Sequence, residues 1–245
     1  MSGLTQKLPG PMRETTPEAV RLAKTLIRTA SFGSIAVLDP HDGTPYVSRV
    51  SVATDFDGTP VTLISRLSFH TKALLEDQRC SLLLGEPGKG DPLAHPRITL
   101  SCKAAFLDRG KPEYEFAQLR FLRRNPKSKL YAGFGDFSFV RLEIRNASLN
   151  AGFGQAFALN GGELLSFQSE TLRANESKLI EDLNETGIGL ITTFAEKAGL
   201  KAIGRISVTG CDPDGIDIVS GGRPGRIWFA EMAATVENVF VELSR

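Results

Sequence analysis

The chain has 245 residues, of which 41% are hydrophobic and 23% charged, and its formal net charge is +1 at pH 7. This length allows one large domain or two smaller ones, and either arrangement can bury a real hydrophobic core. A net charge this close to zero argues against broad nucleic-acid binding and against attraction to a membrane surface.

Targeting signals and cysteines both bear on the compartment. Residues 1–13 are polar and contain proline and glycine, unlike a signal peptide, and no apolar run is long enough to cross a bilayer. Cys80, Cys102 and Cys211 are odd in number, far apart and set in apolar stretches. We therefore expect buried free thiols, no metal site, and a cytoplasmic protein.

The N-terminal segment predicts an arm followed by a helix. Residues 1–15 are typical of a mobile arm. Thr16 and Pro17 match a helix N-cap and a first-turn proline, and apolar residues then recur at helical spacing as far as Ala30. The opposite face of this helix is basic, and we expect it to be solvated at Arg21, Lys24 and Arg28.

Strand-like segments follow, separated by turns and two helices. Residues 39–43 form a strong turn signal, residues 71–77 predict a short helix, and residues 112–125 predict an amphipathic one. The basic run from Arg120 to Arg124 is again expected to be a solvated helix face. Antiparallel strands with inserted helices predict a small β-barrel. The strands are expected at residues 32–38, 46–54, 61–65, 81–85, 97–107 and 137–149.

A second unit is predicted near the C-terminus. Residues 168–175 are polar and resemble a linker, and residues 179–194 carry apolar residues at helical spacing despite their glycines. The remaining elements are expected to be strands at 202–209, 216–220 and 227–229, a turn at 221–225 and a helix at 232–243. We therefore divide the chain into a barrel unit, residues 1–168, and a small α+β unit, residues 169–245.

One strand end carries residues suited to binding an anion. An apolar strand ends at Ser65 and Arg66, and His70, Thr71 and Lys72 then open a short helix. Hydroxyls, cations and free helix N–H groups at a helix start are the donors that bind phosphate. The alternative is an ordinary capped helix with solvated cations.

The preceding strand adds two more polar side chains. Residues 49–54 alternate polar and apolar side chains, so Arg49 and Ser51 face one side of their strand. If this strand lies beside the one that ends at Ser65, both side chains reach the same ligand. The pattern favours a phosphorylated cofactor, and flavin mononucleotide (FMN) is the first candidate.

Four segments together resemble the pyridoxamine-5'-phosphate-oxidase-like, FMN-binding split barrels, and in particular their haem-utilisation (HugZ-type) branch. Their order and spacing carry the resemblance more than any one of them does. The C-terminal unit also looks like the small domain that often follows such barrels. The segments are RVSVATD (49–55), SRLSFHTK (65–72), GDPLAHPRITL (90–100) and GFGQA (152–156).

The resemblance implies a split β-barrel that forms a homodimer and binds FMN at the dimer interface. The protein would then be a flavin-dependent oxidoreductase, in which the flavin carries the electrons and no catalytic acid or base is assigned. Its partners would be a second copy and an unidentified small-molecule substrate. The cofactor-binding residues that the resemblance implies are Arg49, Ser51, Ser65, Arg66, His70, Thr71 and Lys72.

Histidine placement separates the alternatives. The haem-utilisation branch commonly carries a histidine in its C-terminal domain, whereas all three histidines here precede residue 96. We assign His70 to the cofactor pocket and expect His41 and His95 to be exposed polar residues. The alternatives to flavin chemistry are a haem-binding protein that uses the same dimer cleft and a cofactor-free dimeric interaction module.

Overall fold

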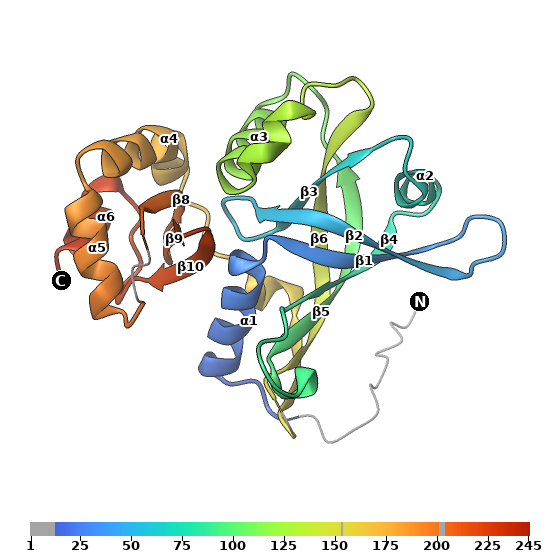
Figure 1. Cartoon of the computed structure of the whole chain (residues 1–245), viewed down its shortest axis with the longest axis horizontal. Coiled ribbons are helices and arrows are strands. Elements are labelled where there is room, and N and C mark those ends of the chain that lie inside the picture. The colour runs from blue at the N-terminus through green and yellow to red at the C-terminus, as the bar shows by residue number, and fades with distance from the viewer. Residues whose placement is uncertain (1–12, 153, 201–203) are drawn as a thin grey trace.

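The computed structural model describes residues 13–152, 154–200 and 204–245, which form two antiparallel sheets (Figure 1). The larger sheet has the strand order β3-β2-β1-β4-β5-β6-β7, and β3 also pairs with β6. This additional pairing closes six strands into a barrel, with β7 added at the edge. The prediction of an antiparallel barrel with inserted helices is confirmed.

The barrel unit contains strands, α-helices and short 3-10 helices. Its strands are β1 (Phe32–Leu38), β2 (Pro45–Thr54), β3 (Pro60–Ser65), β4 (Arg79–Leu84), β5 (Arg97–Phe106), β6 (Phe137–Asn150) and β7 (Ala156–Asn160). Its helices are α1 (Pro17–Thr29), α2 (Phe69–Glu76), η1 (Pro92–Ala94), α3 (Pro112–Arg124), η2 (Pro126–Leu130) and η3 (Gly161–Leu164). The sequence patterns predicted the six barrel strands but not β7.

Helix α1 packs into the barrel core through small and branched side chains. Thr16 is its N-cap, because its Oγ1 accepts a hydrogen bond from the Ala19 N–H at 3.2 Å. Ala19, Ala23 and Ile27 are at most 4% exposed and belong to the same apolar cluster as the inward-facing strand residues. Most of the arm expected at residues 1–15 lies outside the described residues; Arg13 donates its N–H to the Ala156 carbonyl.

The C-terminal unit is a three-stranded sheet covered by helices. Its elements are α4 (Glu170–Glu185), α5 (Ile188–Lys197), β8 (Ile206–Asp212), β9 (Gly215–Ser220), β10 (Arg223–Trp228) and α6 (Val236–Leu243). The sheet and helices enclose an apolar cluster of their own, which also receives Phe56 from the barrel unit. The boundary after residue 168 stays a prediction.

Three local predictions in this unit are wrong, and two elements have shifted boundaries. The strand expected at 202–209, whose first two residues lie outside the described residues, is β8 and begins at Ile206, and the helix expected from residue 232 begins at Val236. The polar segment 168–175 is the start of α4, because Ser169 caps the helix by accepting from the Leu172 N–H. The helical pattern 179–194 belongs to two helices, which are separated at Gly187. The expected turn 221–225 is shorter, since its last three residues already pair with β9 as the start of β10.

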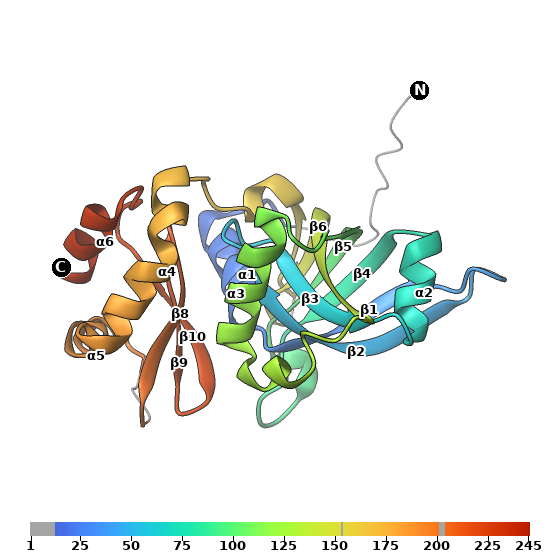
Figure 2. The same ribbon diagram turned by 90° about the horizontal axis from the view of Figure 1, so that it is seen from above.

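Buried ion pairs join the two units, on the side of α1 and α3 that faces β8–β10 (Figure 2). Arg28 of α1 lies 2.8 Å from Asp212 of β8, with side-chain exposures of 1% and 0%. Arg120 of α3 pairs with the buried Glu176 of α4. The prediction of two solvated basic faces is therefore wrong at these positions, because the acids that cover them come from the other unit.

The cysteines are buried and free, as expected. Cys80 on β4 lies directly opposite Cys102 on β5, and Cys211 lies on β8. Among the described helices, none has the length and apolar character that crossing a membrane requires.

Candidate functional site

Three of the seven residues expected at the cofactor site lie on the outer face of the barrel. Ala53 of β2 is directly opposite Val61 of β3, so these two side chains face the same side of the sheet. Because side chains alternate along a strand, Arg49 and Ser51 share that side with Ala53, and Ser65 shares it with Val61. The structure therefore places these three polar residues on one face of two neighbouring strands.

The two strands separate before they reach the expected ligand groups. Their paired residues end at Val52 and Thr62, and the Thr62 hydroxyl donates to the Ser51 carbonyl at 2.9 Å. Arg49 is directed toward β1, where its guanidinium carbon lies 5.2 Å from the centre of the Phe32 ring. Arg49 is exposed and its charge remains available to an anion on this face.

Ser65 is already engaged by a residue that sequence analysis missed. Its hydroxyl donates to the Asp136 carboxylate at 2.6 Å and accepts from the Leu67 N–H at 3.1 Å. The Arg66 N–H donates to the Asp136 carbonyl at 2.8 Å, so one residue fixes both the side chain and the backbone at this strand end. The Ser65 hydroxyl cannot donate to a phosphate while it donates to Asp136.

The start of α2 contains free polar groups. Ser68 is the N-cap, and its carbonyl accepts from the N–H groups of Thr71 and Lys72, but its side chain makes no capping hydrogen bond. The expected helix start at Thr71 is therefore two residues too late. Thr71 is fully buried, and its hydroxyl has no hydrogen-bond partner among the described residues. Arg66 and Lys72 are exposed.

His70 differs from the other two histidines in its surroundings. It is half-buried in the first turn of α2, and burial lowers the pKa of its imidazole, which favours the neutral form at pH 7. His41 lies exposed in the β1–β2 turn, as expected. His95 is half-buried instead, with Nε2 3.0 Å from the Lys89 carbonyl oxygen.

An aromatic contact fixes α2 against the β1–β2 hairpin. The rings of Tyr46 and Phe69 lie 4.4 Å apart between centres, which holds the first turn of α2 beside β2. Neither this contact nor Asp136 has a local signal in the sequence. Asp136 lies 71 residues from Ser65 and meets it only because β3 pairs with β6.

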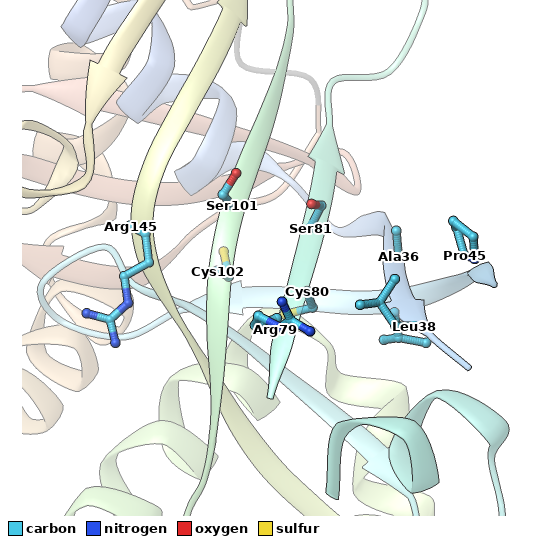
Figure 3. A pocket seen from close by; sticks show the side chains of 10 residues that line it. Ala36, Leu38, Pro45, Arg79, Cys80, Ser81, Ser101, Cys102 and Arg145 are labelled. Carbon is cyan, nitrogen blue, oxygen red and sulfur yellow. The ribbon is translucent and has the colours of Figure 1, made fainter. Parts of the chain in front are cut away.

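A cavity of about 450 Å³ lies on neighbouring strands (Figure 3). Ala36 of β1, Ser81 of β4 and Ser101 of β5 are consecutive partners across the sheet, so they face the same side and contribute small side chains to the lining. Arg79 and Arg145 add positive charge to it. None of the residues expected at the cofactor site lines this cavity.

Comparisons with known proteins identify the barrel. The family model of the CREG β-barrel matches residues 14–163, more than half of the chain. The chain belongs to the CREG β-barrel family. The resemblance to split barrels of the haem-utilisation type is thereby confirmed at the level of family and fold.

Relatives of this CREG-family chain include proteins whose names concern haem. A non-canonical haem oxygenase of the chloroplast from Arabidopsis thaliana is 37% identical over 145 residues, which are 56% of this chain and 42% of that protein. The present chain thus spans less than half of that relative's length.

Solved structures support the whole two-unit fold. A protein of unknown function from Agrobacterium tumefaciens is 30% identical, with a TM-score of 0.84 over 97% of this chain and 99% of that one. A haem-binding protein from Mycobacterium smegmatis is 23% identical, with a TM-score of 0.58 over 94% and 96% of the two chains. The second similarity concerns the fold alone.

Proposed function

We propose that this CREG-family protein binds a flat, anionic cofactor on the outer face of its barrel beside α2, and that this cofactor is haem. The observation that carries the proposal is the 37% identity to a non-canonical haem oxygenase. Haem needs a ligand for its iron and cations for its two carboxylates, and the residues around α2 supply both.

His70 is suited to be the iron ligand. Haem iron is held by histidine, cysteine thiolate, methionine or tyrosine. His70 is half-buried, and its lowered pKa keeps the imidazole in the neutral form that binds metals. The Cys80 thiol is a poor candidate, because burial raises its pKa to about 12 and keeps it protonated.

Three exposed cations fit the carboxylates. Arg49 lies on the outer face of β2, Arg66 follows β3, and Lys72 lies in the first turn of α2. Arginine and lysine form charge-assisted hydrogen bonds to carboxylate and phosphate groups alike. The same cations therefore also suit FMN, the cofactor that the sequence first suggested.

A specific observation keeps FMN as the second candidate. The Thr71 hydroxyl is buried without a hydrogen-bond partner among the residues that the structure describes, and the Ser68 side chain makes no capping bond. The half-buried Ser68 hydroxyl at the start of α2 matches a donor that a phosphate needs, whereas the fully buried Thr71 hydroxyl becomes accessible only if the helix start moves. The carboxylate of Asp136, which holds Ser65, is the feature of this site that disfavours a phosphate dianion.

A homodimer through the barrel is part of the proposal. Phe32, Val47 and Leu83 are 39%, 61% and 42% exposed on strands that surround the cavity of Figure 3. Large exposed apolar side chains beside small ones form a surface that a second copy can cover. The cofactor would then lie between this face and the partner.

The chain's own residues bind and orient the cofactor. Bound haem would supply iron redox chemistry, and bound FMN would supply electron transfer through its ring. We assign no catalytic acid or base. The cytoplasm is the proposed compartment, since three free cysteines fit a reducing environment.

Titration of the purified 245-residue chain distinguishes the two cofactors. Haem binding predicts a shifted Soret band at a defined stoichiometry, and His70→Ala abolishes the shift while His41→Ala preserves it. FMN binding predicts that the flavin remains with the protein on gel filtration. An Arg66→Ala, Lys72→Ala double variant weakens whichever anionic cofactor binds.

Two results would contradict the proposal. If the haem titration gives no saturable Soret shift, haem is excluded as the cofactor. Retention of FMN by the same protein would then favour FMN, the second candidate. If the protein takes up neither haem nor FMN, both cofactors are excluded. The cofactor-free dimeric interaction module is then the remaining hypothesis, and analytical ultracentrifugation tests whether the dimer forms.

A further inference from the structure

A second concave site lies where the two units meet, away from the residues assigned to the cofactor. It is a groove of about 560 Å³ between α1 and the segment that joins β10 to α6. Small-molecule sites usually have volumes of about 300–1,000 Å³ and mostly apolar walls. The apolar residues of this groove are Pro17, Val20, Trp228, Phe229, Ala230 and Met232.

Two of these side chains present apolar surface to solvent. Met232 is 57% exposed, and Trp228 is half-buried. The indole of Trp228 is fixed, because its Nε1–H donates to the Thr25 hydroxyl of α1 at 3.1 Å. A rigid aromatic ring beside a flexible thioether provides a wall that adapts to an apolar ligand.

The acids that line the groove all have partners. Glu163 accepts from the Asn160 N–H at 2.7 Å. Asp214 accepts a hydrogen bond from the Lys24 ammonium at 3.1 Å and another from a serine hydroxyl. The charge of Lys24 is therefore paired as well. Glu231 pairs with the C-terminal Arg245 at 3.3 Å.

Arg21 is different from the other charged residues of the groove. Its guanidinium carbon lies 5.1 Å from the centre of the Trp228 ring, and Arg21 forms no ion pair with any acid among the described residues. The groove therefore offers an apolar wall next to a cation whose guanidinium makes no hydrogen bond or ion pair with any described residue. A guanidinium in this position binds a carboxylate through two parallel hydrogen bonds.

We propose that this groove binds a small organic carboxylate with an apolar body, with the carboxylate at Arg21 and the body against Trp228 and Met232. A purely apolar ligand leaves Arg21 unpaired, and a simple inorganic anion gains nothing from the apolar wall. Because α1 belongs to the barrel unit and Trp228 to the C-terminal unit, one bound molecule contacts both units. This site is independent of the proposed cofactor.

Trp228 provides the signal for the test, since it is the chain's single tryptophan. The 245-residue chain is titrated with octanoate while the tryptophan fluorescence is followed, and octanol serves as an uncharged probe of equal length. We expect a saturable change with octanoate. Arg21→Gln should weaken octanoate binding by about ten- to a hundredfold, which corresponds to a lost charged hydrogen bond, and should leave octanol binding unchanged.

Arg223→Gln is the matched control, because Arg223 is exposed on the same strand as Trp228 and does not line the groove. It should bind octanoate like the unmodified protein. The proposal is overturned by a fluorescence change that never saturates. It is also overturned if octanol binds as tightly as octanoate, or if Arg21→Gln and Arg223→Gln behave alike.

Discussion

Replacing Asp212 by asparagine should strongly destabilise the protein, because Asp212 neutralises two buried arginines. Its carboxylate accepts two hydrogen bonds from Arg226, at 2.6 and 2.8 Å, and lies 2.8 Å from Arg28 of the other unit. Side-chain exposures are 0% for Asp212 and Arg226 and 1% for Arg28. The guanidiniums cannot turn toward water once the carboxylate charge is gone.

The expected size follows from the burial of all three groups. Removing one member of a buried ion pair costs about 3–5 kcal/mol when a charge is left buried and uncompensated. Asp217 still lies 3.0 Å from Arg226 and 3.7 Å from Arg28, but it also pairs with Arg120, so one carboxylate is too few for these arginines once Asp212 is gone. For a chain of this size, each kcal/mol lowers the melting temperature by roughly 2–4 °C, so Asp212→Asn should lower it by about 6–20 °C. Calorimetry and urea unfolding measure both quantities.

The pH dependence gives a second readout for the same residue. Burial raises the pKa of Asp212, but the charges of Arg226 and Arg28 outweigh it and hold this pKa at about 2, below its ordinary value of 3.8. A carboxyl whose pKa is lowered by folding stabilises the folded state fully above its ordinary pKa, and this contribution is lost as the pH falls through the lowered value. The stability difference between the unmodified protein and Asp212→Asn should therefore stay constant from pH 7 to about 4 and shrink toward pH 2.

The control is Asp77→Asn, which breaks an ion pair with Arg79 whose side chains are 29% and 77% exposed. Water solvates both partners there, so the free energy of unfolding should change far less than in Asp212→Asn. Equal losses in the two variants would refute the argument from burial. A stability difference that persists unchanged down to pH 2 would refute the pKa shift.

Three further predictions concern the site and the thiols. In haem titrations, the affinity should not depend on pH from 8 down to 6.5, the ordinary histidine pKa, and should fall only below it. The reason is that burial lowers the pKa of His70. A fall in affinity whose pH midpoint lies above 6.5 would contradict this. Asp136→Ala should strengthen FMN binding by up to about tenfold, since it frees the Ser65 hydroxyl and removes a negative charge. Weaker binding in this variant would show that Asp136 mainly orders the backbone after Ser65. The thiols should react slowly with an aromatic disulfide reagent at pH 8 and completely after unfolding, because all are buried and the pKa of Cys80 is raised to about 12; rapid reaction in the folded state would contradict their burial.

The barrel could be predicted from the sequence because its signals are local. Alternating side chains and turn residues within short segments located β1 to β6 to within about two residues, and the cap at Thr16 fixed the start of α1. Strand alternation also placed Arg49 and Ser51 on one face. Such patterns depend on neighbours in sequence, and the structure preserves them.

Features that depend on distant residues could not be predicted in this way. Arg28 and Arg120 have the spacing of a solvated basic helix face, and their partners lie in the second unit, Glu176 being 56 residues from Arg120. The Ser65–Asp136 hydrogen bond requires the pairing of β3 with β6. Single-sequence patterns carry no information on such contacts, which is why a basic face looked exposed and a serine looked free.

The buried charges define how the two units meet. An apolar contact between α1 and β8 would allow the units to slide, because dispersion and hydrophobic burial have little directional preference. Arg28 lies 2.8 Å from Asp212 of the other unit, while its guanidinium also donates to the Phe56 carbonyl and the Ser166 hydroxyl of its own unit, so this one side chain is held from both sides. The same arrangement brings Trp228 to α1, where its indole N–H donates to the Thr25 hydroxyl beside the groove. We infer that the ion pairs contribute less to stability than an apolar core of equal size, and that their role is to fix the relative position of the units on which the groove depends.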